Sequence, residues 1–121
     1  MTAIFKHIML MVKDIPATVK FYQEGLGLDV KVSTPGWAEL KAGETTIALH
    51  GANENGQTAN APILSFHVED VYKSIEKLES LGANLEGRVR EPSFGKVAAM
   101  RSPDGTLISL LEPNQSSAEE K

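Results

Sequence analysis

Residues 4–12 (IFKHIMLMV) are almost all apolar, and a period of two divides them into two largely apolar faces with His7 on one of them. Such a segment predicts a β-strand that is covered on both sides. Asp14 follows and is a good N-cap for a helix. From Ile15 to Leu26 apolar residues then recur at helical spacing instead of at every second position. We therefore predict a strand followed by a helix that ends at Gly27.

Shorter strand-like segments follow this helix. A Pro-Gly turn at residues 35–36 and an Ala-Gly-Glu turn at residues 42–44 separate them. The predicted strands of this first half are residues 28–33, 37–41 and 45–50. The polar segment at residues 51–61 is interpreted as a linker to the second half.

The second half repeats the first. VKDI at residues 12–15 corresponds to VEDV at residues 68–71, 56 residues later, and each motif leads through a helical pattern to a Leu-Gly pair. The second half is predicted to hold a helix capped by Asp70, a loop at residues 91–95, and strands at residues 63–68, 84–90, 97–101 and 106–111. The sequence therefore predicts an α+β fold of two βαβββ modules. We expect their four-stranded halves to form a curved mixed sheet around a cleft, which is a usual place for a small-molecule site.

Length and composition fit this picture. The 121 residues are expected to form a single domain over residues 1–113, with modules at about 4–50 and 62–112, and a disordered tail at 114–121. The net charge of −4 argues against nucleic acid or an anionic membrane as partner. No cysteine is present, which excludes thiolate chemistry and cysteine-ligated zinc. We expect no signal peptide, no membrane-spanning segment and a cytoplasmic location.

The duplication, the Phe-Tyr at residues 21–22 followed by Leu-Gly-Leu at 26–28, and the SPDGTLI hairpin at 102–108 resemble the vicinal oxygen chelate superfamily. This superfamily includes glyoxalase I, extradiol dioxygenases and bleomycin-resistance proteins, and the resemblance covers about residues 4–113. It implies the glyoxalase/bleomycin-resistance fold. It also implies a divalent metal that binds two vicinal oxygens of a substrate as a Lewis acid.

The resemblance places the metal ligands of the superfamily on the first and last strands of each module. These positions are His7, Ala48, Ile63 and Ser109 in this chain, and the internal repeat also pairs His7 with Ile63 and Ala48 with Ser109. Only His7 carries a suitable ligand, whereas such a site needs several imidazole or carboxylate groups. We therefore expect no metal cofactor, as in the metal-free bleomycin-binding members, and keep a divalent metal as the alternative.

Other candidate residues are individually weaker. His50 and His67 share strand faces with Ala48 and Ile63 but lie about 7 to 13 Å along the strands, so a shifted three-histidine metal site is the less favoured interpretation. His7 and Glu39 are the candidate catalytic residues, although a solvent-facing strand position is the favoured interpretation of Glu39. The candidate ligand-binding residues are His7, Trp37, Ala48, His50, Ile63, His67, Phe94 and Ser109. Arg88, Arg90 and Lys96 surround Phe94 and are consistent either with a cationic lid or with a solvated loop.

Three functions remain open from the sequence. The first is a glyoxalase/bleomycin-resistance-like protein that binds a small organic molecule in the cleft without metal. The second is a metal-dependent lyase or dioxygenase with rearranged ligands, and the third is a metal-free acid–base enzyme that uses His7 or Glu39. Fold alone decides none of them. We also expect a homodimer, because two-fold dimers are the commonest oligomers.

Overall fold

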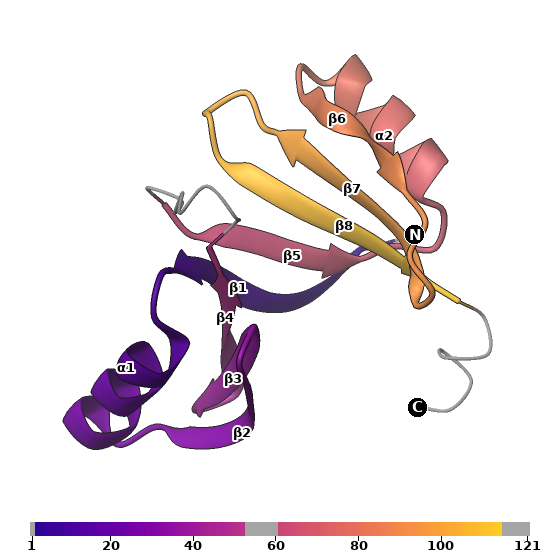
Figure 1. Ribbon diagram of the computed structural model, residues 1–121. Coiled ribbons are helices and arrows are strands. Elements are labelled where there is room, and N and C mark those ends of the chain that lie inside the picture. Colours follow the sequence, from indigo (N-terminus) through magenta and orange to yellow (C-terminus); the bar gives the residue numbers. More distant parts are fainter. Residues whose placement is uncertain (1, 53–60, 115–121) are drawn as a thin grey trace. The chain divides into compact units, whose positions relative to one another are not determined.

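The computed structural model describes residues 2–52 and 61–114, so the predicted tail beyond Asn114 and most of the predicted linker lie outside the described residues. The chain divides into a first unit, His7–Pro62, and a second unit, which comprises residues 1–6 and 63–121. Both units carry the predicted order of strands and helix (Figure 1). Eight strands and two helices are present in the described part of the chain, which confirms the predicted α+β class.

Apart from the first helix, the predicted element boundaries differ from the observed ones by a few residues at most. The elements of the first half are β1 (Ile4–Val12), α1 (Ile15–Lys20), η1 (Phe21–Gly25), β2 (Asp29–Thr34), β3 (Trp37–Ala42) and β4 (Thr45–Gly51). Those of the second half are β5 (Ile63–His67), α2 (Val71–Ser80), β6 (Asn84–Arg90), β7 (Gly95–Arg101) and β8 (Leu107–Pro113).

The first helix differs from the prediction in its second half. Asp14 caps α1 as expected, since its carboxylate accepts from the Ala17 amide at 2.9 Å. Beyond Lys20 the helix widens into the π-type turn η1 instead of continuing as an α-helix. Gly27, at a φ of 75°, then ends the segment, and its amide donates to the Gln23 carbonyl at 3.0 Å.

The two units share one pattern of strand pairing. In the first unit β3 pairs antiparallel with β2 and β4, and β1 pairs parallel with β4. In the second unit β7 pairs antiparallel with β6 and β8, and β5 pairs parallel with β8. The parallel registers coincide, because Met9 lies opposite Ala48 in the first unit and Ser65 lies opposite Ser109 in the second. The structure therefore reproduces the alignment that the internal repeat predicts.

Each unit has a core of its own between its helix and one face of its strands. In the first unit α1 packs against β3 and β4, and the buried residues of this core are Ile15, Val19, Ala38, Leu40 and Leu49. In the second unit α2 packs against β6, β7 and β8, and the buried residues are Val71, Ile75, Ala83, Ala98, Met100 and Leu110. Among the described helices, none is long and apolar enough to cross a membrane.

Polar contacts join the strands of the second unit at the C-terminal end of β7 and in the turn that follows it. Arg101 donates from Nη2 to Glu86 Oε1 at 3.1 Å and from Nη1 to the Gly105 carbonyl at 3.1 Å. In the following turn the carboxylate of Asp104 accepts from the hydroxyls of Ser102 and Thr106. These contacts favour the charged carboxylates, so the Arg101 hydrogen bond lowers the pKa of Glu86, and the Ser102 and Thr106 hydrogen bonds lower that of Asp104.

These lowered pKa values predict a loss of stability in acid. A carboxyl group whose folded pKa is depressed contributes stability above its unfolded pKa, about 4, and that contribution disappears as the pH falls through the folded pKa. We expect Asp104→Asn to be less stable than the wild type at pH 7, with the difference shrinking below about pH 4. Urea unfolding at pH 7, 5 and 3.5 measures it. A difference that stays constant over this range would contradict the assignment.

Candidate functional site

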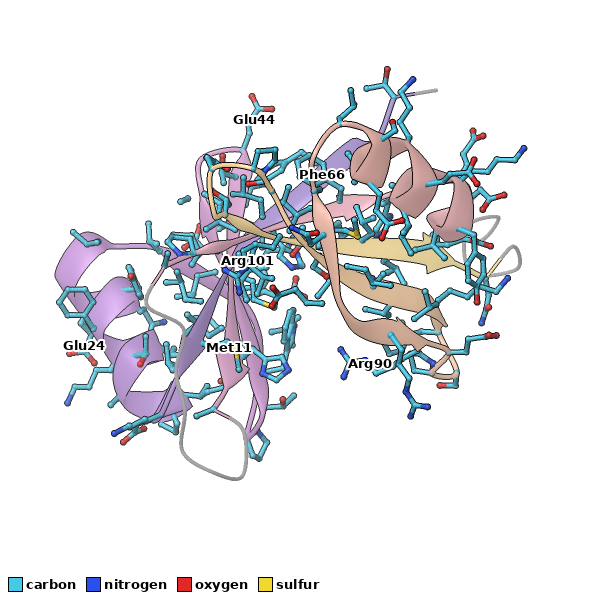
Figure 2. All side chains as sticks on the ribbon, turned by 90° about the horizontal axis from the view of Figure 1, so that it is seen from above. Met11, Glu24, Glu44, Phe66, Arg90 and Arg101 are labelled. Carbon is cyan, nitrogen blue, oxygen red and sulfur yellow. The ribbon has the colours of Figure 1, made fainter. Side chains whose placement is uncertain are left out.

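The candidate site lies on the face of the first unit's strands that points away from α1. Leu10, Leu40 and Leu49 pack toward α1, so strand alternation directs their neighbours to the opposite face. We call it the Trp37 face; its members are His7, Met9, Met11, Trp37, Glu39, Ala48 and His50. The registers bring them together across three strands, since His50 lies opposite both Trp37 and Met11. Figure 2 labels Met11 on this unit.

Trp37 is the centre of the cluster and the only tryptophan of the chain. Its ring lies 5.7 Å from the His7 ring at an interplanar angle of 62°, and 6.0 Å from the His50 ring at 87°. Both are edge-to-face contacts, the arrangement that aromatic pairs prefer. Two imidazoles are therefore held beside one half-buried indole.

Glu39 is fixed by the same tryptophan. Trp37 Nε1 donates to Glu39 Oε2 at 2.8 Å, and the carboxylate is partly buried rather than solvent-facing. Glu39 lies directly opposite Ala48 in the β3–β4 pairing. Directly opposed residues have Cβ atoms about 5 Å apart on one face. The carboxylate therefore lies one strand away from the position where the vicinal oxygen chelate pattern places a ligand.

His50 has a defined tautomer when it is neutral. Its Nδ1 lies 2.7 Å from the Gly51 carbonyl oxygen, which can only accept, so Nδ1 carries the proton. The neutral imidazole then keeps a lone pair on Nε2. Since His50 is exposed, Nε2 can accept a hydrogen bond or a proton from a bound molecule.

The second unit shows that the fold does not require this cluster. Trp37 and His50 correspond by register to Val97 and Leu111, and Glu39 corresponds to Ala99. All three are apolar, although they occupy equivalent places in equivalent strand pairs. The polar and aromatic groups of the Trp37 face are therefore an addition to the scaffold, which is what a binding or catalytic site requires.

The four positions of the superfamily's metal ligands do not fit a divalent metal. Ala48 and Ile63 are buried aliphatic side chains, and Ser109 offers only a hydroxyl. His7 is the sole imidazole among the four. Within residues 2–52 and 61–114, no three His, Asp or Glu side chains gather closely enough to hold an ion.

The other predicted residues lie in the second unit. His67 and Ser109 are half-buried on the face opposite α2, where Leu111 lies opposite His67 in the β5–β8 register. Phe94 is 54% exposed. The Lys96 ammonium lies 3.7 Å from Glu112 Oε2 and 5.7 Å from the centre of the Tyr72 ring, and the cationic lid stays a prediction.

Sequence reasoning identified His7, Trp37, Glu39 and His50 separately but did not assemble them. The separation assumed for His50 was its distance along the strand from the ligand position at Ala48. In the structure the Trp37 indole contacts the rings of both His7 and His50. The signal was the hairpin turn, which the structure narrows from the predicted residues 42–44 to residues 43–44. A hairpin closed by Ala42 and Thr45 sets Trp37 opposite His50.

Comparisons with known proteins agree with this architecture. Residues 4–110 match the model of the Glyoxalase/Bleomycin resistance protein/Dioxygenase superfamily. A probable lactoylglutathione lyase of Vibrio parahaemolyticus is 25% identical, with 93% of this chain and 92% of the relative covered. An uncharacterised protein of Bacillus subtilis is 29% identical, with coverages of 87% and 94%.

Among solved structures, a superfamily member from Vibrio splendidus superposes with a TM-score of 0.69 at 19% identity, covering 92% of this chain and 99% of that one. This likeness shows the fold. The family model spans almost the whole chain, and the paired βαβββ units carry the same strand order in each half. The chain therefore belongs to the Glyoxalase/Bleomycin resistance protein/Dioxygenase superfamily.

Proposed function

We propose that this chain binds a small organic molecule on the Trp37 face without a metal ion. The observation that supports this most is the cluster of Trp37, His7, His50 and Glu39, whose equivalents in the second unit are apolar. Ligand sites combine apolar and aromatic walls with a few fixed polar groups. The predicted cleft between the two modules remains a prediction, and this proposal does not depend on it.

The chemistry of the cluster favours a flat ligand that carries hydrogen-bond donors. The indole offers a surface for stacking, while Met9 and Met11 add soft apolar contacts on the same face. The Glu39 carboxylate and the His50 Nε2 lone pair both accept hydrogen bonds. Heteroaromatic amides and amines combine a planar ring with such donors, so they are the first compounds to screen.

The test uses Trp37 as its own reporter. We expect flat heteroaromatic amides or amines to change the fluorescence of the single tryptophan, because a ligand stacked on the indole alters its surroundings. For a compound found this way, Trp37→Ala should weaken the affinity at least about tenfold, as for a buried aromatic anchor. Calorimetry measures the affinity of this variant, since it has lost the fluorophore.

Two substitutions separate the polar contacts. Glu39→Gln removes the charge but keeps the shape, and should weaken binding of an amine more than that of an amide. Glu44→Gln is the matched control, because Glu44 is exposed in the β3–β4 turn (Figure 2) and should leave both affinities unchanged. Equal affinities for wild type, Trp37→Ala and Glu39→Gln would exclude the Trp37 face as the binding site.

A metal-free acid–base enzyme is the second candidate function, and the tautomer of His50 favours it. With Nδ1 bound to the Gly51 carbonyl, Nε2 of the neutral ring is the nitrogen that can take a proton. A bound ligand that is converted by the wild type but not by His50→Gln would support this function over simple binding. The Vibrio parahaemolyticus relative is named a probable lactoylglutathione lyase. That activity has less support for this chain, because three of the four superfamily ligand positions lack an imidazole or carboxylate group.

The homodimer and the cytoplasmic location remain predictions.

A further inference from the structure

The turn that precedes Trp37 is held by a side chain. Pro35 and Gly36 join β2 to β3, and Thr34 lies opposite Trp37 where the two strands meet this turn. The Thr34 hydroxyl donates to the Trp37 carbonyl oxygen at 3.0 Å, and its oxygen accepts from the Trp37 amide at 3.1 Å. One hydroxyl therefore binds both backbone groups of Trp37. We call this pair of hydrogen bonds the Thr34 clamp.

The Thr34 clamp acts on the residue that connects the members of the Trp37 face. From the first position of β3, the indole contacts Glu39 through a hydrogen bond and the rings of His7 and His50 through their edges. All three contacts depend on the backbone of one residue at the end of a strand, where local opening is easiest. A side-chain hydroxyl that satisfies both backbone groups at this point adds order to the whole cluster.

The same turn is also joined to the backbone beside His50. The Gly36 carbonyl accepts from the Gly51 amide at 3.1 Å, and Gly51 supplies the carbonyl oxygen that lies 2.7 Å from His50 Nδ1. A Cβ atom at Gly51 would lie 3.6 Å from the Gly36 carbonyl oxygen, so the turn lies directly against the end of β4. The turn therefore links the backbone that carries Trp37 to the backbone that orients His50.

The second unit provides a comparison for the clamp. Arg90 and Val97 are the strand pair that corresponds to Thr34 and Trp37, and residues 91–96 lie between them in place of a tight turn. An arginine side chain has donors but no acceptor, so it cannot bind an amide and a carbonyl together as a hydroxyl does. The shared strand pairing therefore does not require the clamp, which occurs in the unit where the strand end carries Trp37.

We propose that Thr34 is a positioning residue of the Trp37 face. Its clamp holds the indole in the orientation that contacts Glu39, His7 and His50, and so orders the face before a ligand arrives. This inference deepens the proposed function and rests on it for the effect on binding. A site that is ordered in advance loses less conformational entropy when it binds, so loss of the clamp lowers the affinity.

Thr34→Val tests the clamp without any ligand, because it removes the hydroxyl but keeps the β-branched shape that suits a strand. The single tryptophan gives one indole N–H signal in spectra of nitrogen-labelled protein, and its hydrogen exchange reports how persistently Nε1 binds Glu39. We expect this hydrogen to exchange about fivefold faster in Thr34→Val, as for the loss of one hydrogen bond. Thr34→Ser keeps the hydroxyl and should retain the wild-type rate.

Thr45→Val is the matched control. It makes the same substitution opposite Ala42, at the other end of β3 from Trp37, and should leave the indole exchange rate unchanged. Urea unfolding confirms that each variant is folded under the conditions of the exchange measurement. Equal rates in wild type and Thr34→Val would overturn the positioning role, as would equally raised rates in Thr34→Val and Thr45→Val or a raised rate in Thr34→Ser.

Nicotinamide, a flat heteroaromatic amide, is the binding probe, and calorimetry measures its affinity. The affinity should fall about fivefold in Thr34→Val and stay unchanged in Thr34→Ser and Thr45→Val. Unchanged affinity in Thr34→Val despite faster indole exchange would overturn the inference, because the clamp would then not serve binding. Faster exchange in Thr34→Val together with no binding of nicotinamide by the wild type would support the positioning of the indole and count against the proposed ligand class instead.

Discussion

Gly95→Ala is expected to destabilise the protein by about 3 kcal/mol or more, the largest effect we predict for a single methyl group. Gly95 opens β7 opposite Pro113 of β8, with a φ of 150° that side chains rarely adopt. A Cβ atom there would lie 2.3 Å from the Glu112 carbonyl oxygen and 3.0 Å from Pro113 Cα. Both are backbone atoms, so no rotamer change relieves the clash and the β7–β8 pairing must open.

Urea unfolding and thermal melting measure this effect, and a fall in Tm of ~10 °C or more is expected. Gly36→Ala is the matched control. It adds the same methyl group in a turn where no atom lies within 4 Å and φ is not positive, so its stability should stay within about 0.5 kcal/mol of the wild type. Similar losses in the two variants would show that the close β7–β8 approach at Gly95 is not present in solution.

Leu49→Ala is expected to lower the free energy of unfolding by about 3 kcal/mol, as substitutions that leave a large cavity in a packed core usually do. Leu49 is fully buried between the strands and α1, with Leu40 and Ile15 in the same cluster. Its neighbours along β4 are Ala48 and His50, which point to the Trp37 face. The cavity therefore removes the anchor that holds these two residues in register, and ligand binding on the Trp37 face should weaken along with stability.

Leu81→Ala is the control for this substitution, because Leu81 is 65% exposed at the end of α2 and the same truncation leaves no cavity. Its stability should change by less than about 1 kcal/mol. Circular dichroism follows the unfolding of both units in both variants, and Trp37 fluorescence adds a probe of the first unit, to which Leu49 belongs. A Leu49→Ala protein as stable as Leu81→Ala would contradict the packing of the α1 core.

The sequence predicted most of the fold because the same pattern of strand and helix periodicity occurs in both halves of the chain. Strand and helix patterns, the Asp14 and Asp70 caps and the 56-residue offset agree with one another, and such consistency specifies a fold. The widened turn η1 was missed, because Phe21 and Tyr22 suit an α-helix as well as a π-type turn. The conformation of Gly95 was also missed, since its close approach to β8 arises only when two distant strands pair.

The candidate site was predicted in parts. Hairpin register determines that Trp37 and His50 are opposite each other, and this could have been derived from the turn. The hydrogen bond from the Trp37 indole to Glu39 could not, because residues two apart on one strand share a face without any rule that their side chains meet.

The equivalence between the two units has a consequence for how relatives of this protein diverge. Strand pairing and the helix cores remain the same whether Trp, Glu and His or Val, Ala and Leu occupy the outward positions of β3, β4, β7 and β8. Mutation of those positions is thus largely uncoupled from folding, and a change of ligand demands no change of backbone. Duplication gives such a lineage two independently variable surfaces, so one half can acquire a new specificity while the other half conserves the old.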